Sequence, residues 1–367
     1  MSDKITRKTA LKASAALIAL LALFEPALAQ TTNDIEDPSG KANEVVKQVT
    51  TPTVSVEHKT PTNSHARRVA LALGGGGTRG AAHVGVLRVL QREGIPIDAI
   101  AGTSMGAIVG GMYAAGVSVD TLEKKFDDCS LMKHFMTVPL PVRVVVAPIM
   151  VVPRAFGHHA YDGLYKGGKF RKYLDASVPQ FEQNIEELKI PFAAVALDVV
   201  DGKPYRLSKG NLGYALQASS AVPGLRKPVQ IGEQLFVDGG VVENVPVDEA
   251  RAMGADIVIA VDVDERFDPV PLDTFRAMGS MSKRMVALQL ANVDAPQLKR
   301  ADLVIHPMVD GIGLISTKAE DAKKAMRAGE KAAEEALPAI KAKLAQVGIA
   351  LVPPGAPAAH APATSSR

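Results

Sequence analysis

Cysteine and aromatic residues are scarce in this chain of 367 residues. It has one cysteine, Cys129, and no tryptophan, and aromatic residues make up 4% of the sequence. A single cysteine excludes an intramolecular disulfide framework and a cysteine-based metal site. The core must therefore consist mainly of alanine, valine, leucine and isoleucine. A hydrophobic share of 47% and a charged share of 22% are typical of a globular protein with a sizeable core.

An excess of one charge is also missing. The formal net charge is +3, and no long run of lysine or arginine occurs. A charge so close to zero gives no electrostatic argument for nucleic-acid binding, so we expect no nucleic-acid partner. The length alone suggests one large domain or two small ones.

The first 29 residues follow the three-part pattern of a secretory signal peptide. A basic start precedes the apolar run 13–24, and small residues follow at Ala27 and Ala29. The apolar run is shorter than the roughly 20 residues of a membrane-spanning helix. We therefore expect cleavage near Ala29 and an exported, periplasmic or secreted protein. An uncleaved anchor and a surface helix are the alternatives.

The composition divides the remaining chain into a central domain and two flanking segments. Residues 30–66 are polar and lack a period, and residues 351–367 are rich in proline and alanine, so we expect both to be disordered. Within residues 67–350, short apolar strands alternate with helical patterns. This order predicts an α/β fold with a largely parallel sheet covered by helices on both faces.

The expected elements can be assigned by their apolar runs and periods. The strand candidates are residues 69–73, 97–101, 192–197, 257–261 and 303–305. The helical patterns cover residues 82–93, 105–115, 247–253 and 318–337. We expect the last of these to be an amphipathic helix on the sheet, with Pro338 ending or kinking it.

A glycine-rich loop follows the first strand, and a helix follows the loop. The loop is Gly74-Gly75-Gly76-Gly77-Thr78-Arg79-Gly80. Consecutive glycines cost backbone entropy, which suggests a need for positive φ or for close approach of the backbone. Such a loop points several N–H groups at one spot and forms an anion cradle. Dinucleotide binding, an oxyanion hole and a ligand-free tight turn all remain open for this motif.

A nucleophile elbow is predicted after the second strand. Gly102-Thr103-Ser104-Met105-Gly106 has the Gly-x-Ser-x-Gly pattern at a strand-to-helix turn. Glycines on both sides remove Cβ atoms that would clash in so tight a turn. The pattern holds Ser104 Oγ at the carboxyl end of the strand, so we expect Ser104 to be a nucleophile. A packing turn of small residues is the alternative.

Asp238 is the strongest candidate for the proton acceptor of Ser104. It ends the apolar run Leu235-Phe236-Val237 and precedes Gly239 and Gly240. A carboxylate is a weak base unless burial raises its pKa. An ordinary Asp-Gly turn is the alternative. No histidine stands clearly at the position expected for a Ser–Asp–His triad, although His306 comes nearest; the others considered are His83, His134, His158 and His159.

Taken together, these motifs resemble those of the patatin-like phospholipase family. The resemblance rests on LALGGGGTRGAAHVGVL, GTSMG, LQASSAVPG, VDGG and ENVPV, in this order between about Val69 and Val263. It implies a three-layer α/β/α fold with a mainly parallel central sheet, and a Ser–Asp dyad without a catalytic histidine. It also implies lipid acyl hydrolysis without a cofactor, a lipid ester or phospholipid substrate, and transient contact with a membrane surface.

The resemblance assigns roles residue by residue. Ser104 corresponds to the nucleophile and Asp238 to the general base. Gly75, Gly76 and Gly77 match the oxyanion loop, and Arg79 stands at the basic position of the family. The resulting expectation is a phospholipase A or lysophospholipase. A carboxylesterase or acyltransferase on non-lipid substrates, or a non-catalytic lipid- or anion-binding protein, are the alternatives.

Three further segments are ambiguous from sequence. Residues 137–156 are apolar and contain four prolines, so a lid near the site and a buried strand with a loop are both plausible. His158 and His159 lack a third metal ligand at a recognised spacing, and we expect an exposed loop there. Acidic residues also follow the strand at 257–261. Because they lack the glycine and the final glutamate of a calcium loop, we expect a solvated strand end there; these residues are Asp262, Asp264, Glu265 and Asp268.

Overall fold

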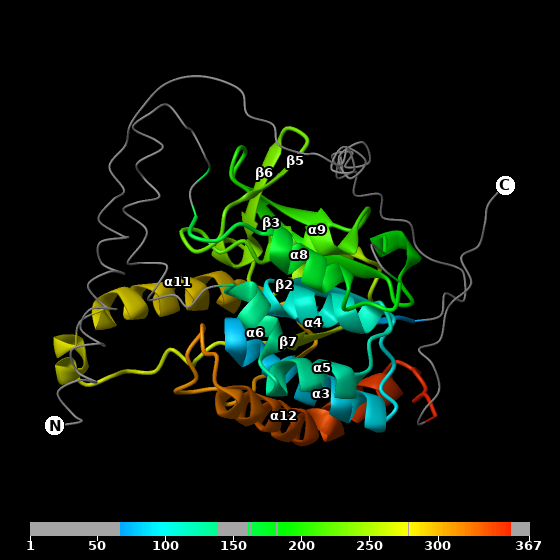
Figure 1. Cartoon of the computed structure of the whole chain (residues 1–367). Coiled ribbons are helices and arrows are strands. Elements are labelled where there is room, and N and C mark those ends of the chain that lie inside the picture. Colours follow the sequence, from blue (N-terminus) through cyan, green and yellow to red (C-terminus); the bar gives the residue numbers. More distant parts are fainter. Residues whose placement is uncertain (1–66, 138–160, 162, 181–182, 278, 354–367) are drawn as a thin grey trace, which may run out of the picture.

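A mixed eight-stranded sheet forms the centre of the molecule (Figure 1). The computed structural model describes residues 67–137, 161, 163–180, 183–277 and 279–353. The predictions for residues 1–66, for nearly all of 137–156, for His158 and His159, and for residues 354–367 lie outside the described residues. The strands are β1 (Val69–Leu73), β2 (Ala99–Thr103), β3 (Phe192–Asp198), β4 (Lys203–Leu207), β5 (Val229–Ile231), β6 (Gln234–Asp238), β7 (Ile257–Val261) and β8 (Leu303–Ile305).

The helices lie on both faces of this sheet. The α-helices are α3 (Ala82–Arg92), α4 (Met105–Ala114), α5 (Val119–Asp127), α6 (Ser130–Phe135), α8 (Gly168–Asp175), α9 (Leu212–Ser219), α10 (Val247–Ala252), α11 (Ser280–Leu298) and α12 (Ala319–Gln346). The short 3-10 helices are η1 (Gly77–Ala81), η2 (Ile185–Glu187), η3 (Gly239–Val241) and η4 (Leu272–Arg276). Within the described residues, no helix is both long and apolar enough to cross a membrane.

The sheet has a parallel part and an antiparallel part. The strand order is β5-β6-β3-β2-β1-β7-β8, and β4 also pairs with β3. Strands β3, β2, β1, β7 and β8 are parallel, whereas β4, β6 and β5 join in antiparallel pairs. The expected mainly parallel sheet of the patatin fold is thus confirmed, with an antiparallel extension at one end.

Alternating strand residues divide the core into two layers. On one face, Leu71 and Ile100 pack in the larger core with residues of α3, α4 and α9. On the other face, Ala70 and Ala101 pack with α10 and the C-terminal end of α11. Both faces are buried, as the continuous apolar strands indicate. The structure therefore has the three layers that the resemblance implied.

Most predicted strands lie where the apolar runs placed them, with one displacement and two omissions. β2 begins at Ala99 rather than residue 97, because the Asp98 carboxylate accepts a hydrogen bond from Val69 N at the entry to β1. β4 was not predicted because it is largely exposed and contains Pro204, which suits only an edge strand. β5 has only three residues and an exposed centre.

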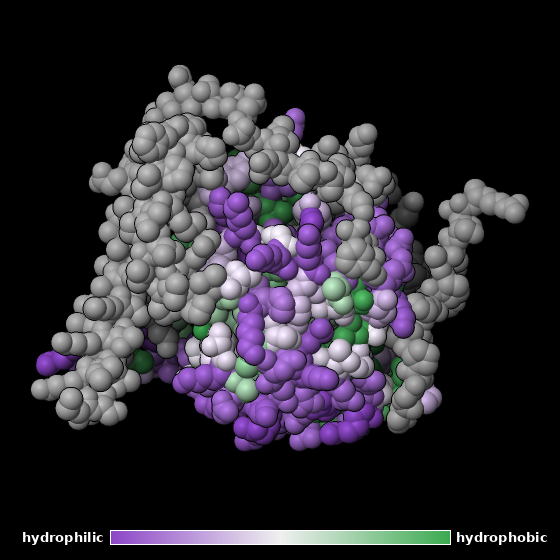
Figure 2. Space-filling view, viewed as in Figure 1, coloured by the Kyte–Doolittle hydropathy of each residue, from purple (hydrophilic) through white to green (hydrophobic). Residues whose placement is uncertain are grey.

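Helix α12 differs from the last helical pattern in where it ends and in what it packs against. It continues through Pro338 to Gln346, because Ile340 and Leu344 beyond the proline are buried and offset the roughly 3 kcal/mol that a helical proline costs. It also packs chiefly on α3 rather than directly on the sheet. A Cβ at Gly329 would lie 2.0 Å from Ala82 O, and one at Gly85 would lie 2.1 Å from Met326 O. Hydrophilic residues cover this side of the molecule (Figure 2).

Candidate active site

Ser104 lies in a strained turn between β2 and α4. Its φ of 52° and ψ of −119° belong to a region that residues other than glycine rarely adopt. A Cβ at Gly102 would lie 2.7 Å from Ala107 N, and a Cβ at Gly106 would lie 2.1 Å from Leu73 O. The two glycines therefore permit the turn, which holds the half-buried Ser104 at the N-terminal end of α4.

Asp238 lies within hydrogen-bond distance of this serine. Ser104 Oγ donates to Asp238 Oδ2 at 2.6 Å, and Gly240 N donates to Asp238 Oδ1 at 2.9 Å. Gly239 is required by close packing, because a Cβ there would lie 2.5 Å from Val195 O. The backbone of the Asp-Gly-Gly turn thus binds one carboxylate oxygen of Asp238, and the other oxygen binds the serine hydroxyl.

The sheet topology brings Ser104 and Asp238 together across 134 residues of sequence. Thr103, the last residue of β2, pairs with Val195 of β3, and Asp238 pairs with the next residue, Ala196. β4 occupies the opposite edge of β3, because Ala196 also pairs with Tyr205. Strands β2 and β6 therefore share one edge of β3 and point their carboxyl ends at each other.

Burial makes Asp238 a stronger base than an ordinary aspartate. The residue is 6% exposed. Burial raises the pKa of Asp238 from 3.8 to about 6, while the hydrogen bonds from Ser104 and Gly240 lower it and only partly compensate. Within the described residues, Asp238 has no ion pair that would favour its charged form. A carboxylate with this pKa is ionised at neutral pH and accepts a proton more readily than an exposed one.

Ser219 supports the strained nucleophile, and sequence reasoning assigned it no role. Ser104 N donates to Ser219 Oγ at 2.9 Å, and Ser219 Oγ donates to Val195 O at 2.6 Å. The fully buried hydroxyl thus ties the turn to the strand that also pairs with Asp238. The segment LQASSAVPG contained this residue, but nothing in its spacing indicated a contact with Ser104.

The glycine-rich loop packs beside Ser104. A Cβ at Gly75 would lie 3.1 Å from Ser104 Cβ. Gly75 N donates to Asn244 O at 3.2 Å, so it is occupied, whereas Gly76 N and Gly77 N have no partner within the described residues. Gly77 adopts a φ of 56°, and a Cβ there would lie 2.0 Å from Leu314 O. Two backbone donors are therefore available in a loop that tolerates only glycine.

Arg79 is a buried part of the loop's support. Its Nε donates to Ile312 O at 2.8 Å, and its guanidinium pairs with Glu265 at 3.0 Å. The residue is 5% exposed, so the structure supports the loop-holding role over attraction of a phosphate head group. The long segment after β8 thereby fixes the loop, as Thr78 Oγ1 also donates to Ser316 O at 2.9 Å.

No histidine within the described residues bonds to the Ser104 hydroxyl. His83 Nε2 lies 2.8 Å from Gly74 O, and burial lowers the pKa of His83 to about 4. Its imidazole is therefore neutral at pH 7. His134 Nδ1 lies 2.7 Å from Ser130 O, and His306 Nδ1 lies 3.0 Å from Asp262 Oδ2.

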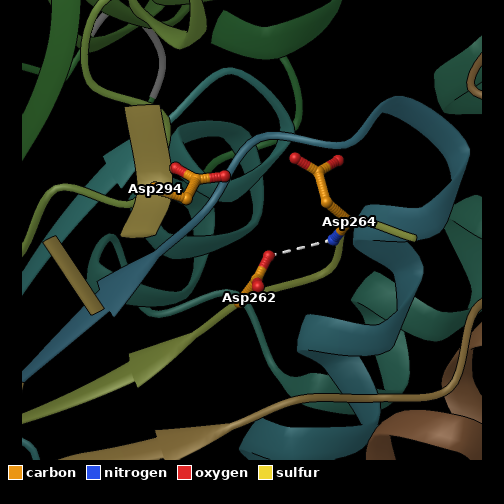
Figure 3. Close-up of side chains that lie close together, drawn as sticks. All are labelled: Asp262, Asp264 and Asp294. Atoms are coloured by element: carbon orange, nitrogen blue, oxygen red, sulfur yellow. Dashed lines mark hydrogen bonds between the residues drawn. The ribbon is translucent and has the colours of Figure 1, made fainter. Parts of the chain in front are cut away.

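The acidic residues after β7 are not a solvated strand end, and that expectation is wrong for Asp262 and Asp264. Both are buried, and they lie near Asp294 of α11 (Figure 3). One carboxylate oxygen from each of the three lies within 4.8 Å of the others. In the described part of the chain, no other set of three or more histidine, cysteine, aspartate or glutamate side chains is grouped so closely. Only Glu265 and Asp268 of the original run are more exposed.

Protein groups already bind much of this acidic cluster, which we define as Asp262, Asp264 and Asp294. Asn244 Nδ2 donates to Asp264 Oδ2 and to Asp294 Oδ2, at 3.0 Å in each case. Arg79 lies 3.8 Å from Asp264 Oδ1. Burial, followed by repulsion from Asp262 and Asp294, raises the pKa of Asp264, and burial raises that of Asp294 to about 7. A cavity of about 150 Å³ borders the cluster.

Comparison with the sequences of known proteins agrees with the motifs. The sequence model of a family described as patatin-like phospholipase matches residues 71–251. An uncharacterized NTE family protein of Mycobacterium tuberculosis is 34% identical over 201 residues, which cover 55% of this chain and 50% of that protein. A lysophospholipase of Aspergillus fumigatus is 31% identical over 210 residues, which cover 56% of this chain and 12% of that protein.

Among solved structures, VipD from Legionella pneumophila is similar to this chain. The match has a TM-score of 0.41 and 14% identity, and it covers 75% of this chain and 67% of VipD. The matched region covers half or less of the length of each curated relative described above.

Proposed function

Residues 71–251 of this chain belong to the patatin-like phospholipase family, and we propose that the protein is a serine lipid acyl hydrolase. The hydrogen bond of 2.6 Å between Ser104 Oγ and Asp238 Oδ2, at a strained strand-to-helix turn, carries this proposal. A packing turn of small residues would not require an unfavourable backbone at the serine or a buried carboxylate with a raised pKa.

In the proposed reaction, Ser104 Oγ attacks the carbonyl carbon of an ester. Asp238 Oδ2 accepts the hydroxyl proton and then delivers it to the oxygen of the leaving alcohol. The acyl group remains on Ser104 until water attacks the same carbonyl carbon, again with Asp238 as the base. The raised pKa of Asp238 suits both directions of proton transfer.

The backbone N–H groups of Gly76 and Gly77 are the proposed oxyanion donors. Both lack partners within the described residues, and the neighbouring Gly75 packs on Ser104. Removing one such donor typically costs about 3–4 kcal/mol of transition-state stabilisation. Contact of the loop with the serine favours this role over dinucleotide binding.

The substrate class follows from the family and its named relatives. A fungal relative that shares this region is a lysophospholipase, so we propose phospholipase A or lysophospholipase activity, with transient contact between the protein and a lipid surface. We also propose export, based on the signal-peptide pattern that ends near Ala29. N-terminal sequencing of the protein from periplasmic and medium fractions would test the cleavage.

Release of fatty acid from phospholipid and lysophospholipid vesicles tests the activity. Wild-type protein, Ser104→Ala and Asp238→Asn are compared, and each is also treated with a fluorophosphonate probe. We expect release and labelling at Ser104 by the wild type, and loss of release in both variants. Hydrolysis of short water-soluble esters without release from either lipid would favour the non-lipid esterase. A folded wild type that neither releases acid nor labels would contradict the hydrolase and favour a binding protein.

A further inference from the structure

Asn244 lies between the two loops that border the Ser104–Asp238 pair. Its backbone oxygen accepts the hydrogen bond from Gly75 N at 3.2 Å. Its side-chain Oδ1 lies 2.5 Å from the position of a Cβ at Gly75 and 3.0 Å from that of a Cβ at Gly240. The absence of a Cβ at Gly75, and the room left at Gly240, let the amide contact the oxyanion loop and the Asp238 loop together.

The neighbours of Asn244 extend this contact to the nucleophile. Thr103 Oγ1, immediately before Ser104, donates to Glu243 O at 2.9 Å. Val245 N donates to Asp294 Oδ1 at 3.1 Å. Residues 243–245 therefore join the end of β2, the glycine-rich loop and α11 at one place.

The acidic cluster determines the orientation of the Asn244 amide. Nδ2 donates to Asp264 and to Asp294, and the residue is 3% exposed. A flipped amide would place Oδ1 against two carboxylates and would leave both without this donor. The amide oxygen must therefore face Gly75 and Gly240, because its nitrogen is held on the opposite side.

We propose that Asn244 is a positioning residue for the reaction, and that Asp264 and Asp294 act through it. This inference rests on the proposed function. Asn244 sets the separation between the donors at Gly76 and Gly77 and the base at Asp238, whereas the acidic cluster touches neither substrate nor Ser104. Since a displacement of about 1 Å in such a site can lower a rate about 100-fold, the loss should appear in kcat.

The experiment compares Asn244→Asp, which conserves shape, with Asn292→Asp, the same change on the exposed surface of α11. Asn244→Asp removes both donated hydrogen bonds and adds a carboxylate beside two others. We expect kcat to fall about 100-fold with KM within about threefold, and labelling of Ser104 by a fluorophosphonate to slow in parallel. Asn292→Asp should match the wild type.

A second substitution tests whether the amide–carboxylate contact itself is responsible. In Asn244→Asp combined with Asp294→Asn, the new amide at 294 can donate to the carboxylate at 244, and its oxygen can still accept from Val245 N. We expect this pair to regain at least about tenfold in kcat over Asn244→Asp alone. Thermal midpoints of all variants show whether each is folded, and Asn244→Ala, which adds no charge, replaces Asn244→Asp if that variant unfolds.

Each outcome decides the inference. Full kcat in a folded Asn244→Asp or Asn244→Ala, or no recovery in the double variant, overturns the positioning role while leaving the hydrolase intact. A loss confined to KM also overturns it. If the wild type neither labels at Ser104 nor releases fatty acid, the proposed function fails first and the inference falls with it.

Discussion

Asp238 and the acidic cluster lie in the same region of the molecule but have different surroundings. Within the part of the chain that the structure describes, Asp238 accepts hydrogen bonds only from a hydroxyl and a backbone N–H group. The acidic cluster has the amide of Asn244 and lies near the guanidinium of Arg79 and the imidazole of His306. Asp238 thus has a hydroxyl and a backbone amide as partners, whereas the three carboxylates of the cluster share a side-chain amide, a guanidinium and an imidazole.

This difference shows how the same residue type can serve as a base or as a support. Neutral partners leave the pKa of Asp238 raised and its proton affinity available to Ser104. In the cluster, the lone pairs are used to hold Asn244, Val245 and the loop bearing Arg79. Burial raises the pKa of carboxylates at both sites. What differs is that Asp238 accepts a hydrogen bond from the Ser104 hydroxyl, whereas Asp264 and Asp294 accept theirs from structural groups.

Asp238→Asn should have the largest effect: it should lower the activity and raise the stability at pH 8. We expect kcat/KM for ester hydrolysis to fall about 1,000-fold, since the base is lost. Burial raises the folded-state pKa of Asp238 to about 6, so the buried carboxyl group favours its protonated form. The stability that this gives the folded protein is full below pH 4 and is lost as the pH rises through 6. The variant should therefore melt about 5 °C above the wild type at pH 8 and no higher at pH 4.

The matched control is Asp273→Asn, which changes an exposed aspartate of η4. It should change neither activity nor the thermal midpoint at either pH. Equal midpoints for Asp238→Asn and the wild type at pH 8 would show that the Asp238 carboxylate carries no desolvation cost.

Gly77→Ala should weaken the oxyanion loop. The alanine would need a φ of 56° and would lie 2.0 Å from Leu314 O, so the loop must shift. We expect kcat to fall about 100-fold. Gly202→Ala has the same backbone strain, with a φ of 74°, but no atom within 4 Å of its Cβ. It should cost about 1 kcal/mol of stability and leave kcat unchanged; similar kcat values for both variants would argue against a role of the loop in catalysis.

The pH profile should report the base. We expect kcat/KM to decrease about tenfold per pH unit below about 6, since only the ionised Asp238 accepts the Ser104 proton. Burial also raises the pKa of Asp294, to about 7. Measuring the same pH profile with Asp294→Asn separates the two groups. If the midpoint stays near 6, Asp238 is the titrating group; if the midpoint disappears, the titrating group is in the cluster.

Asp262→Asn should have the smallest effect. It alters the contact of Asp262 Oδ2 with His306 Nδ1, while the new side-chain oxygen can still accept the hydrogen bond from Asp264 N. We expect kcat within about threefold of the wild type and a thermal midpoint within about 3 °C. A loss above tenfold in kcat would place Asp262 in the catalytic machinery and would remove the distinction between the two acidic sites.

The core strands and the strand-to-helix turns were predictable because their signals are local. The apolar runs at β1, β7 and β8 have the predicted bounds. β1 and β7 are buried on both faces, and such a strand needs no polar alternation. The edge strand β4 and the continuation of α12 through Pro338 were not predictable. In both, tertiary packing outweighs the local preference of a proline.

The site was only partly predictable for a related reason. Ser104, Asp238 and the glycine-rich loop belong to motifs whose spacing has a local physical cause. Ser219 and Asn244 also stand within conspicuous segments, but their roles depend on partners more than 20 residues away. Asp294 lies in a helix without any motif, and the acidic run after β7 gave no sign of burial.

By itself, the sequence determined the order of strands and helices, the turn that strains Ser104, and the glycines that let backbones approach. Each depends on neighbouring residues, whose sterics act in any fold that contains them. Only the tertiary structure decided that β2 and β6 meet on one edge of β3, and that buried carboxylates gather around Asn244. Contacts between distant segments and loss of solvent produce these features, and burial raises a carboxylate's pKa only once the chain has folded around it.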